Sequence, residues 1–228
     1  MPELPEVQTV VSDLNKKIKG DTITSFWSDW PKAIKNITLE KFKKIINGRK
    51  ILGARRLGKN IFIDLSGGKT LYIHLKMTGH LLIKFKNQKL GVKSYFNDKV
   101  NQYIHHIWTL KNKNQKLKTL EFSDVRKFAK IVLVDTDQIL KLPEIKKLGI
   151  DAMDSKFNLK KFEKILEKRK QKPVGLVLME QELIAGIGNI YRNEILFNAG
   201  VNPFKKSGNL SKNEIKKIFN STKKILKK

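Results

Sequence analysis

The first six residues place a proline and two acids where they could act together. Residues 1–6 read MPELPE. If Met1 is removed, Pro2 carries a free secondary amine, and an unprotonated amine can attack an electrophilic carbon such as C1′ of a nucleotide sugar. An α-amino group titrates near pH ~8 and a lysine near ~10.4, so a terminal amine supplies more of the reactive form at neutral pH. The segment therefore offers Pro2 as a nucleophile.

The two glutamates could support such an amine. Glu3 adjoins it, where a carboxyl group can donate a proton to an opening sugar oxygen or shuttle one. Glu6 falls in the first turn of an expected helix and can pair with the helix dipole, hold the backbone near Pro2, or do both. The alternative is an ordinary helix start with prolines and acids in their favoured places, and composition alone favours that interpretation.

The charge of the chain indicates its class of partner. The 228 residues carry a formal net charge of +27, which would repel itself unless a polyanion shares it. Nucleic acid is the first candidate, and an anionic membrane surface is the second. Nearly all of the positive charge is lysine, and a lysine excess can also come from a biased genome. The charge therefore supports nucleic-acid binding without proving it.

Several kinds of site and segment are excluded. The chain has no cysteine, which rules out disulfides and thiolate zinc sites within it, and its four histidines show no ligand spacing. We therefore predict no metal and no cofactor. No apolar run approaches the ~18 residues of a membrane span, and the start of the chain is unlike a signal peptide. We predict a cytoplasmic monomer that does not bind membranes.

The first part of the chain is predicted to be a helix followed by a β domain. Apolar residues at steps of three and four indicate a helix over 5–19, with Gly20 just after its end. Many short strands at close spacing then predict a two-layer β-sandwich, with a short helix at 39–47. The expected strands span residues 22–27, 51–56, 61–65, 71–75, 81–85, 103–110, 119–122 and 130–134.

The second part is predicted to be helical. Helices are expected over 159–170, 174–183 and 190–199, and a capping box at 211–214 opens a last one. The fold class is therefore α+β, with an N-terminal helix and β-sandwich followed by an all-α domain. We predict an N-terminal domain over 1–135, a linker over 136–155, a helical domain over 156–228, and a cleft between the domains.

Five motifs in a fixed order resemble the formamidopyrimidine-DNA glycosylase/endonuclease VIII (Fpg/Nei) family. They span essentially the whole chain and read MPELPEV at 1–7, RRLGKN at 55–60, IHLKMTG at 73–79, DVRKF at 124–128 and IAGIGNIY at 184–191. The last of these resembles the first turn of the family's helix–two-turns–helix module. The resemblance implies that the helical domain contains this module and that the partner is damaged double-stranded DNA.

The resemblance implies catalytic roles for four residues. Pro2 would be the Schiff-base nucleophile, Glu3 the acid at the sugar, and Glu6 a supporting carboxylate. Lys59 would contact phosphate and help to transfer protons. Without the resemblance, a solvated hairpin lysine would be the better interpretation of Lys59.

It also implies residues that bind DNA. Met77, Arg126 and Phe128 would fill the gap left by a flipped nucleotide, and Lys127 belongs to the same DNA-probing loop. Taken alone, Met77 and Phe128 would be read as core residues.

Backbone phosphates would be bound by the glycine-rich motif at a helix start. Gly186, Gly188 and Asn189 would approach the phosphates, with Tyr191 beside them, although an ordinary turn between helices would look the same. Two more residues have two open interpretations: His74 is a phosphate contact or a structural histidine, and Lys170 is a DNA contact or a solvated lysine.

Four features depart from the family pattern. The family usually continues into a zinc finger or a zinc-less equivalent, whereas this sequence stops at Lys228 without a cysteine, as a fragment or a natural short form. The expected zinc site and a DNA-contacting arginine would lie in that absent module. A usual lysine is replaced by Gly175, the probing loop has Val125 and Lys127, and an expected histidine near 103–104 is missing.

These observations predict a base-excision repair DNA glycosylase with abasic-site lyase activity. It would remove oxidised bases, chiefly oxidised or ring-opened purines, through a Schiff base on Pro2. The alternative is a catalytically impaired DNA-binding protein on the same scaffold. A basic ribosome-associated protein would explain the lysines and nothing else.

Overall fold

The computed structural model describes residues 1–85 and 102–227. These residues form two compact units, and the chain passes between them more than once. The first unit contains Met1–Pro2, Val7–Arg56 and Asn60–Leu140, and the second contains Glu3–Glu6, Leu57–Lys59 and Lys141–Lys228. Two short segments from the N-terminal half therefore belong to the helical unit.

The first element is helix α1 (Leu4–Ile18), within one residue of the predicted start and end. Its apolar stripe is buried: Val7, Val11, Leu14 and Ile18 are each at most 4% exposed. Gly20 follows with a φ of +90°, a left-handed conformation that glycine adopts readily, so the chain turns sharply there.

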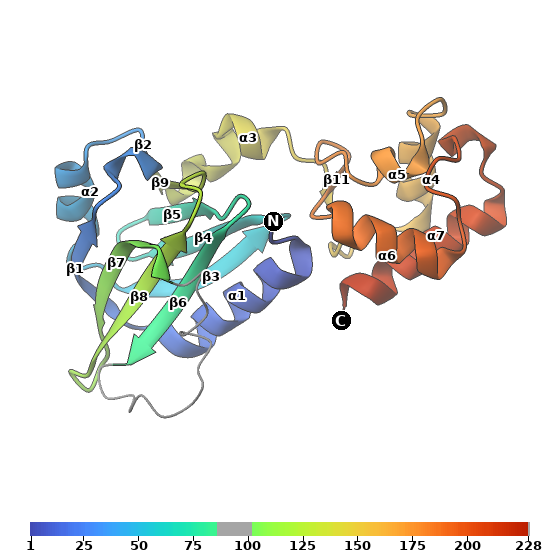
Figure 1. The fold of residues 1–228 in the computed structure, drawn as a ribbon. Coiled ribbons are helices and arrows are strands. Elements are labelled where there is room, and N and C mark those ends of the chain that lie inside the picture. The colour runs from blue at the N-terminus through green and yellow to red at the C-terminus, as the bar shows by residue number, and fades with distance from the viewer. Residues whose placement is uncertain (86–101, 228) are drawn as a thin grey trace. The chain divides into compact units, whose positions relative to one another are not determined.

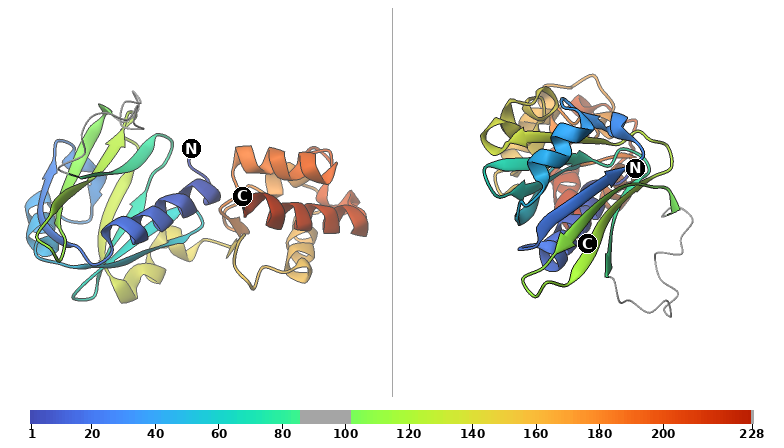
Figure 2. Two further views of the ribbon diagram at one scale, coloured as in Figure 1. Left: turned by 90° about the horizontal axis from the view of Figure 1, so that it is seen from below. Right: turned by 90° about the vertical axis from the view of Figure 1, so that its left-hand side faces the viewer.

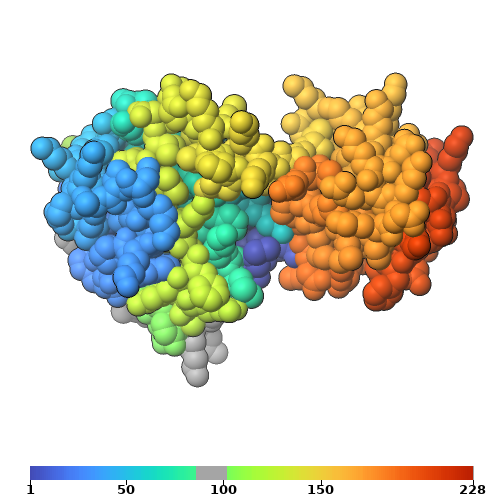
Figure 3. Space-filling model, turned by 90° about the horizontal axis from the view of Figure 1, so that it is seen from above, coloured from blue at the N-terminus to red at the C-terminus, as the bar shows by residue number. Residues whose placement is uncertain are grey.

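Two sheets form most of the rest of the first unit, as Figure 1 shows. One has the strand order β1-β7-β8-β6 and the other β2-β9-β5-β4-β3. Their neighbours described in register are antiparallel, except for the parallel pair β2–β9. In the space-filling view of Figure 3, blue atoms from early in the chain lie against yellow-green atoms from the later part of the same unit. The bounds are β1 (Thr22–Ser28), β2 (Ile34–Lys35), β3 (Ile51–Leu57), β4 (Asn60–Leu65), β5 (Lys69–His74), β6 (Gly79–Phe85), β7 (Ile104–Lys111), β8 (Leu117–Asp124) and β9 (Lys130–Asp135).

A single core lies within this unit. It joins apolar residues of both sheets to α1 and to α2 (Leu39–Ile46), with Phe42, Trp108 and Phe122 among its largest buried side chains. The predicted β-sandwich is confirmed. Strand β2 was missed because two residues are too short to show an alternating pattern.

The second unit is helical and has a core of its own. Helix α7 begins with the predicted capping box, since the Ser211 side chain and Glu214 bond reciprocally to each other's backbone amides. Helices α6 and α7 lie side by side (Figure 2), joined where the Ser221 hydroxyl donates to the Ile195 carbonyl at 2.8 Å. The helices are α3 (Pro143–Lys146), α4 (Leu159–Glu167), α5 (Val174–Val177), α6 (Asn189–Ala199) and α7 (Lys212–Leu226).

Three predicted elements differ from the structure. The helix expected over 159–170 ends at Glu167, and the one expected over 174–183 is only α5, because tight turns follow it and lead into the short strand β11 (Ile184–Ala185). The expected linker contains the 3₁₀ helix η4 (Thr136–Lys141), α3 and strand β10 (Ile150–Asp151). Among the described residues, no helix is both long and apolar enough to span a membrane.

Candidate active site

The carboxylate of Glu3 lies at the N-terminus of helix α6. It accepts three backbone N–H groups, from Gly188 at 2.7 Å, Ile190 at 2.9 Å and Tyr191 at 3.2 Å. The side chain is buried, with 3% of Glu3 exposed. A helix N-terminus favours an anion because its first amides lack partners within the helix. Here the anion is a residue of the protein.

Two glycines make this arrangement possible. A methyl group added at Gly188 would lie 2.4 Å from the Glu3 carboxyl, and one at Gly186 would lie 2.4 Å from Leu4. The Leu4 N–H also donates to the Gly186 carbonyl at 3.1 Å, while the Gly186 N–H donates to the Gln181 side chain. The amides of both glycines are thus bonded within the protein, so their predicted phosphate contacts have no free backbone N–H in this structure.

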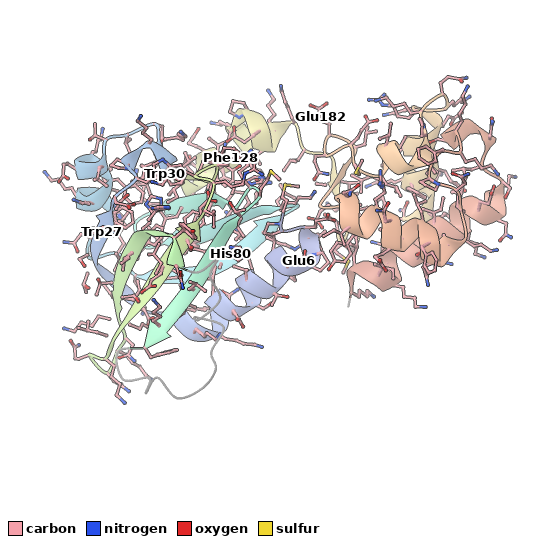
Figure 4. The ribbon with its side chains drawn as sticks, viewed as in Figure 1. Glu6, Trp27, Trp30, His80, Phe128 and Glu182 are labelled. Atoms are coloured by element: carbon pink, nitrogen blue, oxygen red, sulfur yellow. The ribbon has the colours of Figure 1, made fainter. Side chains whose placement is uncertain are left out.

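Glu6 and Tyr191 extend the network. Glu6, which projects from the first turn of α1 (Figure 4), accepts the Glu3 N–H at 2.9 Å and the Tyr191 hydroxyl at 2.8 Å. Burial raises the pKa of Tyr191 far above its usual value, and the hydrogen bond and charge of Glu6 raise it further. Tyr191 is therefore a neutral phenol that donates to Glu6.

Lys59 is a buried cation in the same unit. Only 6% of it is exposed, and among the residues that the structure describes no carboxylate lies within 4.0 Å of its ammonium. Burial lowers the pKa of Lys59, and the charges of Glu3 and Glu6 oppose that shift in part. A larger fraction of Lys59 is neutral at a given pH than for a solvated lysine, which suits a group that accepts and returns protons. Lys59 is therefore not the solvated hairpin lysine that would be expected without the family resemblance.

The remaining catalytic candidate, Pro2, directly precedes Glu3 in the chain. Pro2 is half-buried and belongs to the first unit by its contacts. The structure thus gathers Glu3, Glu6 and Lys59 in the second unit and ties Pro2 to them through one peptide bond.

A second cluster lies in the first unit, on the loops that end β5 and β8. The Arg126 guanidinium donates to the Met77 sulfur at 3.1 Å and lies 4.5 Å from the centre of the Phe128 ring. Met77 is 48% exposed and Phe128 is 52% exposed, so neither is the core residue that its type alone would suggest. Figure 4 shows Phe128 in the loop between β8 and β9.

Asp124 shapes the loop that carries Arg126 and Phe128. It is 1% exposed and accepts the N–H groups of Phe128 and Ala129, both at 2.9 Å. Its other oxygen accepts the Thr78 hydroxyl and the Arg126 N–H. This role was missed from the sequence, although Asp124 begins the motif that was singled out.

The other predicted DNA contacts lie on the surface or at its edge. Lys127 and Asn189 are exposed, and Lys127 has a φ of +54° at the end of the turn that begins at Asp124. His74 accepts the Lys76 N–H through Nδ1 at 3.0 Å, which leaves its proton on Nε2. Lys170 is exposed and lies 3.4 Å from Glu167. These placements are compatible with both interpretations of His74 and Lys170.

Comparison with known proteins decides the family. Residues 1–131 match the family model of the formamidopyrimidine-DNA glycosylase N-terminal domain, and residues 148–228 match that of its H2TH domain. A formamidopyrimidine-DNA glycosylase of Carboxydothermus hydrogenoformans is 38% identical over 226 residues, covering 99% of this chain and 76% of that protein. This chain belongs to the formamidopyrimidine-DNA glycosylase family.

Further relatives agree with this assignment. The formamidopyrimidine-DNA glycosylase of Ureaplasma parvum is 33% identical over 227 residues, covering 99% of this chain and 77% of the relative. Lactococcus lactis Fpg in complex with DNA containing an abasic site matches the fold with a TM-score of 0.84 at 31% identity, covering 99% of this chain and 77% of that one. The predictions of an Fpg/Nei family member and of a base-excision repair DNA glycosylase are confirmed.

The zinc that the family resemblance implied has no thiolate ligands in this glycosylase chain, because its 228 residues include no cysteine. Among the described residues, no group of three or more histidines, aspartates or glutamates is placed to hold a metal either.

Proposed function

We propose that this family member is a bifunctional DNA glycosylase and abasic-site lyase that works through the amine of Pro2. The observation that carries the proposal is the carboxylate of Glu3, the residue next to Pro2, held by three backbone N–H groups of α6. Groups fixed by backbone hydrogen bonds need little reorganisation during a reaction, which is how enzymes stabilise developing charge.

The first chemical step exchanges one bond at C1′ for another. The lone pair of the Pro2 nitrogen forms the N–C1′ bond while the C1′–base bond breaks and its electron pair leaves with the base. The nitrogen then gives up its proton, its lone pair forms the N=C1′ bond as the C1′–O4′ bond opens, and O4′ takes a proton, which leaves a cationic iminium. A secondary amine gives an iminium that is necessarily positive, so it draws electrons strongly.

The second step cuts the strand. The iminium makes the C2′ hydrogen acidic, so loss of that proton is followed by departure of the 3′ phosphate oxygen with the C3′–O electron pair. Hydrolysis of the iminium returns the free amine. No oxidant or reductant is needed at any stage.

Glu3 is suited to exchange a proton with the sugar. A carboxylate has about four lone-pair sites, and three are taken by backbone N–H groups. Oε2 accepts two of these bonds and Oε1 accepts one, so Oε1 has a site left for the sugar oxygen. Glu6 supports this geometry because it accepts the Glu3 N–H.

Lys59 is proposed as the second proton carrier. Burial lowers its pKa, so it releases a proton to the departing base or phosphate more readily than a solvated lysine does. The positive form would also attract the phosphate next to the damaged nucleotide.

The substrate is proposed to be duplex DNA carrying an oxidised or ring-opened purine. Solved relatives were captured with DNA containing carbocyclic 8-oxo-G and with FAPY-dG. Met77, Arg126 and Phe128 would fill the space of the flipped nucleotide, because the Arg126 guanidinium contacts both of the exposed apolar side chains and the three can enter a base stack together. We propose that the chain acts as a monomer, in the cytoplasm where bacterial DNA lies.

Trapping with borohydride tests the proposal directly. The protein is mixed with an abasic-site duplex, borohydride reduces the iminium, and peptide mapping locates the adduct. We expect a stable adduct on Pro2 in protein whose Met1 is absent by mass spectrometry. A matched preparation with an acetylated N-terminus should form none, while binding the same duplex normally.

Two results would contradict the proposal. One is the absence of an adduct although Pro2 is the first residue, which would leave a DNA-binding protein without lyase chemistry. The other is an adduct on a lysine with Pro2 unmodified, which would move the nucleophile elsewhere in the chain.

A further inference from the structure

The turn that carries Lys59 is fastened to the helical unit by one buried carboxylate. Asp151 Oδ2 accepts the Gly58 N–H at 2.7 Å, and Oδ1 accepts the Met153 N–H at 2.9 Å. Asp151 is 8% exposed. Its two oxygens thus join the residue before Lys59 to the segment that follows β10.

We propose that Asp151 is a positioning residue for Lys59, a role that rests on the proposed function of Lys59 in proton transfer. Asp151 would not touch the substrate. It would act by fixing the backbone from which the Lys59 side chain extends.

The shape of the turn makes this contact necessary. Gly58 has a φ of +56°, and a methyl group added there would lie 3.1 Å from the Ala185 side chain. The turn therefore lies directly against β11, where the Gly58 N–H is shielded from water. A shielded N–H without a partner costs free energy, so the turn would move if Asp151 could not accept from it.

The same small sheet fixes Glu3. Strands β10 and β11 pair in parallel, with Asp151 opposite Ala185. The chain after β11 supplies the Gly186 carbonyl that accepts the Leu4 N–H and the Gly188 N–H that donates to Glu3. One strand thus anchors the segment of Lys59, and its partner leads into the segment that anchors Glu3. The paired strands β10 and β11 therefore set the positions of Lys59 and Glu3 relative to each other.

The substitution Asp151→Asn tests this role. The side-chain amide oxygen can accept only one of the two N–H groups well, and its NH₂ faces the other, so one anchoring bond is lost. We expect single-turnover base release, normalised to the fraction of protein that can be trapped by borohydride, to fall on the order of tenfold. Asp154→Asn is the matched control, since Asp154 accepts the Lys156 N–H at 2.7 Å in the same segment and has no bond to the Gly58 turn.

A double-mutant cycle separates positioning from a general loss of structure. In a Lys59→Met background, Asp151→Asn should cause no further fall in rate, because the group that it positions is absent. The pH profile of base release should also shift for Asp151→Asn alone, since a displaced Lys59 is less buried and titrates at a higher pH. A purely structural role would lower the rate equally in both backgrounds and leave the profile unchanged.

Three outcomes would overturn the inference. The first is a normal rate and profile for Asp151→Asn when Lys59→Met is slow, which rejects the positioning role alone. The second is a full additive loss in the double variant. The third is a normal rate for Lys59→Met, which rejects the proposed function of Lys59 as well, while trapping on Pro2 still reports independently on the lyase chemistry.

Discussion

The two candidate clusters of this molecule differ in which kind of side chain is buried and which is exposed. Glu3 and Lys59 are charged groups in the interior of one unit, with the exposed Glu6 bonded to Glu3, whereas Met77 and Phe128 are apolar groups on the surface of the other unit. Charged groups in the interior cost free energy unless they are bonded, and exposed apolar groups forgo the burial that would stabilise the fold. Both clusters go against the usual sorting of residues, which is expected where function rather than folding selects them.

The way each cluster is held also differs. Glu3 is fixed directly, by three backbone N–H groups that bond its own carboxylate. Phe128 is fixed indirectly, because Asp124 bonds its backbone N–H while the ring extends outward. Proton transfer needs an atom at a set position, whereas a wedge between bases needs a firm backbone and an accessible side chain.

The comparison is tested most severely by Glu3→Gln. The side-chain NH₂ of glutamine cannot accept the N–H groups of α6, and it carries no exchangeable carboxyl proton. We expect base release to fall by about 100- to 10,000-fold, the usual range for losing a general acid or base. Single-turnover release of a damaged purine from a duplex measures it.

The matched control is Glu194→Gln, an exposed glutamate of the same helix α6. It should leave the rate within about twofold of the parent, as surface substitutions away from a site usually have small effects. A normal rate for Glu3→Gln would show that the buried cluster is structural only.

Gly188→Ala tests whether this glycine is needed to leave room for the Glu3 carboxylate or to bind a phosphate of the DNA backbone. The added methyl would lie 2.4 Å from the Glu3 carboxyl and would displace it. A displacement of about 1 Å can lower a reaction rate on the order of 100-fold. We therefore expect the rate of base release to fall on the order of 100-fold, while the affinity for DNA stays nearly unchanged. A titration of labelled duplex alongside the rate measurement checks both. Weaker binding at a normal rate would instead support the predicted contact between Gly188 and a DNA phosphate.

Much of the fold followed from local patterns in the sequence. The stripe of α1, the many short strands at close spacing and the capping box of α7 each depend on residues close together in the chain, and all three were confirmed. The helix predicted over 174–183 was wrong because its apolar residues continue past Val177 into tight turns. Periodicity cannot distinguish a buried turn from a buried helix.

The supports of the site could not be predicted in the same way. Asp151 reaches Gly58 across a separation of 93 residues, and Glu3 reaches Gly188 across 185. No local pattern marks an aspartate that will accept a distant backbone N–H. The glycines of the 184–191 motif were recognised, but only the packing reveals that they leave room for Leu4 and Glu3.

Phe128→Ala tests the exposed cluster with a smaller expected effect. Removing the ring should lower the rate on duplex DNA about tenfold, equivalent to ~1.4 kcal/mol of lost contact between a ring and the bases. Because Phe128 is 52% exposed, the free energy of unfolding should change by less than about 0.5 kcal/mol. Urea unfolding and single-turnover release measure the two effects.

Phe122→Ala is the comparison variant, because Phe122 lies in β8, the strand that leads into the loop of Phe128. Phe122 is fully buried, so its truncation should cost about 3–5 kcal/mol of unfolding free energy. If Phe128→Ala destabilised the protein to a similar degree, Phe128 would be a core residue and the wedge interpretation would fail.

The smallest expected effect is a gain in stability from Lys59→Met. Burying the Lys59 ammonium costs free energy that a methionine of similar length avoids, so the variant should be more stable by about 1–2 kcal/mol at pH 7 even as it loses activity. In the folded protein, the pKa of Lys59 lies below its ordinary value of 10.5. At pH values between the folded-state pKa and 10.5, the unfolded chain therefore binds more protons than the folded protein. The stability of the parent should therefore rise with pH in this range, and the stability advantage of Lys59→Met should shrink as the pH approaches 10.5.

Urea unfolding of both proteins from pH 7 to 10.5 measures the difference. The control is Lys44→Met, which replaces an exposed lysine of α2 and should show no such trend. A variant that is less stable than the parent at every pH would mean that Glu3 and Glu6 stabilise the buried cation more than its desolvation costs.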